Sequence, residues 1–327
     1  MLAAALLIGG AVLLYLGAEW FVGGAASLAR SLGVPQLLVG LTVVAYGTSA
    51  PEAVVAAQAA LNDHAAMALG NVVGSNIANI GLILGLSVLV RPAAVPAGVG
   101  RREVPIMVAT ALAVPLAVWL DGGVRRVEGA LFLLAAVTYT AAMVRAARGD
   151  MAREREARRA ASVEAHAADA AGAPSVTRGR GRSLLVALAG AAMLVLGGRW
   201  FVDGATRLAL AVGMSERMVG LTVVAVGTSL PELATSLVAS RRGHGDIAVG
   251  NVLGSNVFNV LLCLGLAACV RPIAASLRAS ALDLGVMVGL TLVAAAMLRA
   301  PRTPKRWEGA ACVGLYAAFL AALAAKG

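Results

Sequence analysis

Long apolar stretches alternate with short polar segments along the whole chain. Each stretch is close to the roughly 20 residues that a helix needs to cross a bilayer. The pattern predicts helices over residues 3–28, 35–60, 66–90, 104–120, 127–147, 183–210, 217–240, 246–270, 280–298 and 308–325. We therefore expect an all-α polytopic membrane protein with ten transmembrane helices.

Composition supports a membrane protein and excludes a soluble domain. Of 327 residues, 60% are hydrophobic and 13% are charged, and the mean hydropathy is +0.85. The net charge of +10 could suggest a nucleic-acid partner, but the basic residues lie between the apolar stretches and form no single basic face. We expect the lipid bilayer as partner, no nucleic acid and no resident cofactor.

The chain contains one pair of motifs twice. Gly-Thr-Ser-Ala-Pro-Glu at 47–52 and Gly-Asn-Val-Val-Gly-Ser-Asn at 70–76 return 180 positions later as Gly-Thr-Ser-Leu-Pro-Glu and Gly-Asn-Val-Leu-Gly-Ser-Asn. Residues 40–92 and 220–272 agree without gaps at more than half of their positions. Five spans in each half is an odd number, so the second copy enters the membrane from the opposite side. We expect two inverted five-helix repeats, 1–147 and 183–327, joined by a linker over 148–182.

The distribution of Lys and Arg predicts the orientation. Most of these residues lie on the side of the membrane that holds the Arg-rich linker 148–182. Cytoplasmic loops carry the excess of basic residues in membrane proteins. We expect a cytoplasmic linker, both termini outside, and a multi-pass protein of the cell membrane that functions as a monomer.

Two carboxylates are the first candidates for function. Glu52 and Glu232 occupy equivalent positions within apolar spans, where an unpartnered charge is costly. Pro51 and Pro231 precede them and lack an N–H, so we expect each helix to open there. An open helix would leave backbone carbonyls near 45–48 and 225–228 free to bind a cation.

Hydroxyl and amide groups recur around these carboxylates at helical spacing. The candidate ligands are Thr48, Ser49, Ser75 and Asn79 in the first repeat and Thr228, Ser229, Ser255 and Asn259 in the second. His, Cys and Lys are missing from both motifs, and such an all-oxygen set suits Ca²⁺ or Na⁺ better than zinc or copper. The other motif amides, Asn71, Asn76, Asn251 and Asn256, are expected to tie the backbone together, and the three cysteines to fill the core.

These motifs resemble the two alpha repeats of the cation/calcium exchanger superfamily, in particular its prokaryotic sodium/calcium antiporters. The resemblance implies four core helices around the ions and sliding of helices 1 and 6 as a pair. It also implies that Glu52 and Glu232 bind both ions and that Ala45 and Ala225 add carbonyl oxygens. One departure is that Asn79 and Asn259 are both amides, whereas some relatives are acidic at the position of Asn259.

The expected function is a secondary antiporter, not an enzyme, in which Na⁺ and Ca²⁺ are the transported substrates. A proton/calcium or other cation exchanger of the same fold is the nearest alternative. A cation channel is a further alternative, although the sequence contains no evident filter. A membrane enzyme fits less well because no His or Lys in the motifs could activate Thr48 or Ser49 as a nucleophile.

Overall fold

The computed structural model describes residues 2–95, 98–164, 179–213, 225–299 and 302–326. Nine helices of this part are long and apolar enough to cross a membrane. The outer helices are α1 (Leu2–Leu32), α6 (Val99–Asp121), α7 (Arg126–Glu164), α8 (Arg180–Ala211), α14 (Leu277–Leu298) and α15 (Arg306–Lys326). The remaining membrane-crossing segments each consist of shorter helices that follow one another.

Three of those segments contain a π-helical portion. In the first segment, Gly40–Val44 joins α2 (Gln36–Val39) to α3 (Ala45–Leu61). In the second, Asn79–Leu84 joins α4 (Ala65–Ala78) to α5 (Gly85–Val90). In the third, Asn259–Leu264 joins α12 (Gly245–Phe258) to α13 (Gly265–Val270). The second and third portions are equivalent in the two repeats. The two portions begin at Asn79 and Asn259. Because π-helical turns recur at functional sites, this position supports both residues as candidate site residues.

Nine of the ten expected spans are confirmed, with ends that differ by a few residues. The tenth, 217–240, lies partly outside the described residues, which contain α10 (Ala225–Thr228) and α11 (Leu230–Arg241).

One small addition to the expected all-α fold is a two-stranded pairing. Strand β1 (Gly123–Val124), between α6 and α7, lies antiparallel to β2 (Ile273–Ala274), between α13 and α14, and so links the two halves.

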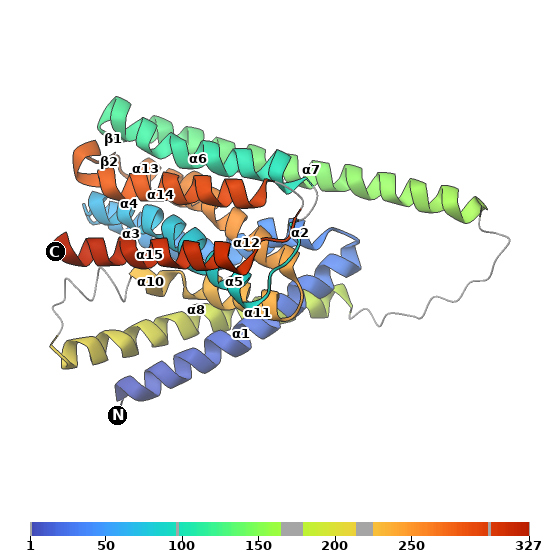
Figure 1. Cartoon of the computed structure of the whole chain (residues 1–327), viewed down its shortest axis with the longest axis horizontal. Coiled ribbons are helices and arrows are strands. Elements are labelled where there is room, and N and C mark those ends of the chain that lie inside the picture. Colours follow the sequence, from blue (N-terminus) through green and yellow to red (C-terminus); the bar gives the residue numbers. More distant parts are fainter. Residues whose placement is uncertain (1, 96–97, 165–178, 214–224, 300–301, 327) are drawn as a thin grey trace.

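Helices α1 and α8 form a close antiparallel pair along one side of the molecule (Figure 1). Glycines spaced seven residues apart line the contact: Gly10, Gly17 and Gly24 in α1, and their repeat equivalents Gly190, Gly197 and Gly204 in α8. A Cβ atom added to Gly17 would lie 2.9 Å from the Gly190 carbonyl oxygen. Small residues of this kind let two membrane helices approach to backbone distance.

The core of the bundle is built from both repeats. Helices α3 and α4 of the first repeat pack against α11 and α12 of the second. Gly40 and Gly250 make one of these contacts so close that a Cβ on Gly250 would lie 2.9 Å from the Leu41 nitrogen. The two inverted repeats therefore share one hydrophobic interior, and residues 180 positions apart face each other across it.

An arginine at the end of each repeat's third span holds a turn of the other repeat. Arg91 donates a hydrogen bond from Nη1 to the Arg241 carbonyl oxygen at 3.1 Å, and its equivalent Arg271 forms an ion pair with Asp63. These two contacts lie at opposite ends of the core helices. They fix the turns α11–α12 and α3–α4 relative to the opposite repeat.

Helix α7 extends well beyond the bundle (Figure 1). It continues to Glu164 and so includes the first part of the expected linker 148–182, and α8 begins at Arg180. The first part of the linker expected over 148–182 is therefore helical, as an extension of α7. Residues 165–178 lie outside the described part of the chain.

Candidate ion-binding site

Glu52 and Glu232 lie in the middle of the bundle, in α3 and in the first turn of α11. Each side chain is 1% exposed, and the two carboxyl groups are near enough for their charges to interact. Two carboxyl groups buried together in apolar surroundings are costly without a cation to offset them. The structure thus brings together the two acids that the sequence singled out.

A hydroxyl group links the two repeats at this point. Ser49 Oγ donates a hydrogen bond to Glu232 Oε1 at 3.2 Å. Its repeat equivalent, Ser229, is 4% exposed, and within the described ranges the Ser229 hydroxyl has no hydrogen-bond partner. Both serines therefore present oxygen to the space between the carboxyl groups.

Several other buried oxygens of the site are also without a hydrogen-bond partner in the described part of the chain. They are both carboxyl oxygens of Glu52, Oε2 of Glu232, the hydroxyls of Ser75 and Ser255, and Oδ1 of Asn79. A buried polar group left unsatisfied costs about 1–3 kcal/mol, and more if it is charged. A bound cation would satisfy the carboxyl, hydroxyl and amide oxygens, and the set of donors fits a hard ion such as Ca²⁺ or Na⁺.

The remaining expected ligands differ in how available they are. Thr48 Oγ1 lies 3.1 Å from the Val44 carbonyl oxygen and 3.2 Å from Asn251 Oδ1. In either contact the hydroxyl acts as donor, so its oxygen lone pairs remain available to an ion. Asn259 has hydrogen-bond partners, because its Nδ2 donates to Asn76 Oδ1 at 3.2 Å and its Oδ1 lies 3.6 Å from the Cys263 thiol. The repeat-related pair Asn79 and Asn259 is therefore not equivalent in this conformation.

The expected opening of both helices is correct for only one repeat. In the second repeat the helix breaks at Ser229, between α10 and α11. In the first repeat it is wrong, because α3 continues through Pro51. Pro51 removes only the one hydrogen bond to the Gly47 carbonyl oxygen, and the flanking helical bonds hold the turn. Ala45 begins α3, and Ala225 begins α10.

The glycines before the prolines have a role that the sequence analysis missed. A Cβ on Gly47 would lie 2.9 Å from the Phe21 ring of α1, and a Cβ on Gly227 would lie 2.1 Å from Val202 Cγ2 of α8. These glycines let the α1–α8 pair approach the site helices. The two glycines lie 180 residues apart, and this repetition was a signal already present in the sequence, although their contacts Phe21 and Val202 are not equivalent residues.

The other motif amides hold the backbone, as expected. Asn71 Nδ2 donates to the Glu52 carbonyl oxygen at 3.2 Å, and its equivalent Asn251 donates to the Glu232 carbonyl oxygen at 3.4 Å. Asn76 reaches the opposite repeat and donates to the Asn256 carbonyl oxygen at 3.3 Å. These bonds position each carboxylate from the neighbouring helix.

Cys263 lies closer to the site than its expected role in the core implied. Its single S–H lies within reach of two acceptors, the Ser49 carbonyl oxygen at 3.7 Å and Asn259 Oδ1 at 3.6 Å, and can donate to one of them at a time. Within the described residues no three His, Cys, Asp or Glu side chains gather at a single metal site. The donors here are two carboxyl groups with hydroxyl and amide oxygens, which is a poor set for a transition metal.

Comparisons with known proteins agree with this geometry. The family model described as sodium/calcium exchanger protein matches residues 2–145 and 182–325. Inner membrane protein YrbG of Escherichia coli is 38% identical over 327 residues, which cover 99% of this chain and 97% of YrbG. The sodium/calcium exchanger MaX1 of Methanosarcina acetivorans is 30% identical, with 97% of each chain covered. The solved structure of the sodium-calcium exchanger NCX_Mj has a TM-score of 0.83 and 28% identity, with 99% of each chain covered.

Proposed function

Because the chain belongs to the sodium/calcium exchanger family, we propose that it is an antiporter that exchanges Na⁺ for Ca²⁺ and exports calcium from the cell. One observation carries this proposal most strongly. Two buried carboxyl groups from inverted repeats lie among hydroxyl and amide oxygens, several of which have no hydrogen-bond partner among the described residues. Such a cluster has the chemistry of a cation site that is completed by its substrate.

The charge of the site suits competition between the two ions. Glu52 and Glu232 together supply two negative charges when ionised, which one Ca²⁺ neutralises. Ser49, Ser75 and Ser255 supply neutral oxygens that replace water around the ion. Sodium ions use the same kind of oxygen ligands, so occupation by Na⁺ would displace Ca²⁺. This competition couples the two fluxes in opposite directions.

Alternating access requires a mobile element beside a fixed site. Helices α1 and α8 pack tightly on each other through glycines and meet the site helices at Gly47 and Gly227. We propose that they move as one body against the core and expose Glu52 and Glu232 to one side at a time. The 1% exposure of both carboxyl groups is consistent with a closed intermediate of this cycle.

The orientation and assembly are part of the same proposal. A cell-membrane protein with both termini outside would place the Arg-rich linker and the end of α7 in the cytoplasm. Each chain contains both halves of its ion site, so a monomer would be sufficient for transport.

Calcium-45 uptake into proteoliposomes tests the proposal. Vesicles loaded with sodium should accumulate calcium when diluted into sodium-free medium, and the rate should saturate with calcium. A proton gradient without sodium should drive no comparable uptake. Uptake driven by protons alone would favour the proton/calcium alternative, and calcium flux that ignores both gradients and does not saturate would favour a channel.

A further inference from the structure

An ion pair joins the α1–α8 pair to one end of the core. Arg242, in the turn between α11 and α12, pairs with Glu19 of α1, and its Nε donates to Glu19 Oε1 at 3.2 Å. Glu19 is the only acidic residue in the sequence of α1, and its side chain is 18% exposed. An acid within a membrane-spanning helix is costly unless it has a partner. The position of α1 along the core is therefore coupled to Arg242.

The internal repeat contains the same two charges with their signs exchanged. The residue equivalent to Glu19 is Arg199 of α8. In the turn between α3 and α4, Asn62 is the equivalent of Arg242, and an acid, Asp63, follows it. Since the repeats are inverted, this turn lies at the opposite end of the core. Each end of the core thus presents one charge, and the α1–α8 pair carries the opposite charge for each end.

Asp63 has a backbone conformation that suits glycine better. Its φ is 64°, and within the described ranges it is the only residue other than glycine with a positive φ. The equivalent residue is Gly243, with a φ of 80°. A side chain is strained in this left-handed region. The turn keeps a carboxylate at this position in spite of the strain, which indicates a use for its charge.

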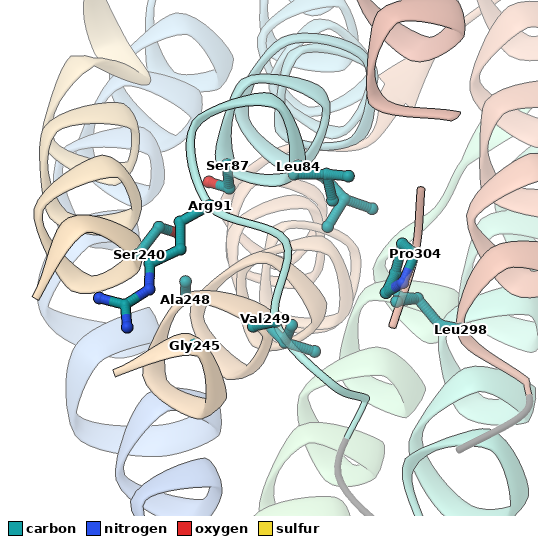
Figure 2. Close-up of a pocket in the computed structure, with 11 residues that line it drawn as sticks. Leu84, Ser87, Arg91, Ser240, Gly245, Ala248, Val249, Leu298 and Pro304 are labelled. Carbon is teal, nitrogen blue, oxygen red and sulfur yellow. The ribbon is translucent and has the colours of Figure 1, made fainter. Parts of the chain in front are cut away.

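At the end that α1 contacts, Arg91 occupies a backbone group and leaves Arg242 to Glu19. Arg91 Nη1 donates to the Arg241 carbonyl oxygen at 3.1 Å. Figure 2 shows Arg91 lying against this end of α11, beside Ser240. The guanidinium of the next residue, Arg242, is therefore available to α1.

At the opposite end the equivalent arginine occupies the acid itself. Arg271 forms its ion pair with the Asp63 carboxylate. The repeat equivalent of the Arg241 carbonyl is that of Leu61. A shift of Arg271 onto the Leu61 carbonyl oxygen would reproduce the arrangement of the first end. It would release Asp63 to bind Arg199.

Helices α1 and α8 carry their two charges as one body. The hydroxyls of Ser27 and Ser183 are buried between the helices and lie 3.0 Å apart. This hydrogen bond adds to the glycine contacts along the pair. Glu19 and Arg199 therefore move together when the pair moves.

The spacing of the charges requires such a movement. Gly17 faces Gly190 in the antiparallel pair, so Arg199 and Glu19 lie 11 residues apart along the axis, or roughly 16 Å. The two turns of the core are separated by the 26 residues of Ala65–Val90, or roughly 39 Å. The pair must shift along the core to bring one charge or the other to its turn.

We propose that two alternative ion-pair latches hold the α1–α8 pair at one end of the core or the other. The first latch, Glu19 with Arg242, is closed in this conformation. The second latch, Arg199 with Asp63, closes when the pair has shifted and Arg271 has released the acid. The inference rests on the proposed movement of α1 and α8. Because each latch exists in one state only, the two set the balance between the states without touching the ion.

Distances between spin labels test the latches in the full chain in lipid vesicles. Leu32→Cys at the end of α1 and Trp307→Cys at the start of α15 provide exposed labelling positions. Cys269→Ala removes the partly exposed native thiol, whereas Cys263 and Cys312 are buried. Spectra are recorded with Na⁺, with Ca²⁺ and with neither ion. Movement of α1 relative to α15 gives two distances, and the ratio of their populations reports the two states.

The variants should change this ratio in opposite directions. Glu19→Gln and Arg242→Gln open the first latch and should shift the ratio about 2-fold to 5-fold away from the state described here. Arg199→Gln and Asp63→Asn open the second latch and should shift it the other way. Glu19→Arg combined with Arg242→Glu restores the ion pair with its signs exchanged. This double variant should return the ratio to that of the parent.

Asp121→Asn is the matched control. It breaks an ion pair with Arg125 at the end of α6, outside the α1–α8 pair. The ratio in this variant should equal that of the parent.

The outcomes separate this inference from the proposed function. One unchanging distance in the parent and in every variant would show that α1 does not move, and the latches would be wrong; calcium-45 uptake by the parent decides independently whether it is an antiporter. If the parent moves but opening the first latch leaves the ratio unchanged, or the double variant does not restore it, only the latches are wrong. A shift of all four single variants in one direction would also overturn them, because it would indicate a general loss of stability.

Discussion

Ser49 Oγ lies 3.2 Å from Glu232 Oε1, so a hydroxyl of the first repeat is bonded to the carboxyl group of the second. This contact joins α3 to α11 at the centre of the molecule. Glu232 Oε2 and both carboxyl oxygens of Glu52 have no hydrogen-bond partner among the residues that the structure describes. The bond from Ser49 therefore orients one carboxyl group and leaves these three oxygens for an ion. The site therefore depends on both repeats at once.

Ser49→Ala should weaken calcium binding without unfolding the protein. A hydrogen bond to a charged group contributes about 1.5–3 kcal/mol, which corresponds to roughly 10-fold to 100-fold in affinity. Calcium titration of the purified protein measures this change. Ser31→Ala is the matched control, because the Ser31 hydroxyl donates to the Leu28 carbonyl oxygen near the end of α1, away from the ion site. Equal calcium affinity in both variants would mean that Ser49 does not orient Glu232.

Gly17→Ala should impair the contact between α1 and α8. Its Cβ would lie 2.9 Å from backbone atoms of Gly190 and Leu194, and overpacking of this kind costs about 1–3 kcal/mol. We expect a lower unfolding temperature and slower calcium flux. Gly23→Ala lies on the same helix with nothing within 4 Å of the added Cβ, so it should match the parent. Identical behaviour of the two variants would contradict close packing of this pair.

Stability should fall in acid partly because of His244. Burial lowers the pKa of His244 below the usual 6.5, and the charges of Arg30 and Arg242 lower it further. Between the folded-state pKa and 6.5 the unfolded chain binds more protons, so stability decreases as pH falls through 6.5 and levels off below the folded-state value. His244→Gln should reduce the loss of unfolding temperature between about pH 7.5 and pH 5.5. An unchanged loss would mean that other groups cause it.

The linker between α7 and α8 should tolerate shortening. No part of either repeat motif lies within 148–182. Deletion of residues 166–172 leaves both α7 and the start of α8 at Arg180 intact. Sodium-driven calcium flux should remain within about two-fold of the parent, since each half of the ion site is unchanged. Loss of flux in a folded variant would reveal a regulatory element in the linker.

Much of this architecture could be predicted because the two halves of the sequence repeat the same motifs and apolar spans. Apolar runs defined the spans, and the repeat placed Glu52, Glu232, Ser75 and Ser255 at equivalent depths. Their convergence then follows from an inverted pair of repeats around one axis. Local pattern and duplication were sufficient here, since neither depends on the details of packing.

Differences between the repeats could not be predicted, because they arise from tertiary contacts. The same motif, Gly-Thr-Ser-x-Pro-Glu, is a continuous helix around Pro51 and a broken one at Ser229. In the described part of the chain the amide of Asn79 has no hydrogen-bond partner, whereas Asn259 contacts Asn76 and Cys263. Packing between the repeats decides which of them holds which arrangement, and no single-sequence pattern records that packing.

Competition between calcium and sodium for one site with two carboxylates is the central claim, and equilibrium calcium binding to the purified protein tests it most directly. The parent should bind Ca²⁺, and added Na⁺ should displace it competitively. Glu52→Gln and Glu232→Gln should each weaken calcium binding at least about 100-fold, because each leaves a single charge for a divalent ion. Glu128→Gln, which changes an acid at the start of α7, should bind as the parent does. Sodium-sensitive calcium binding of parental affinity in either Glu52→Gln or Glu232→Gln would contradict the account.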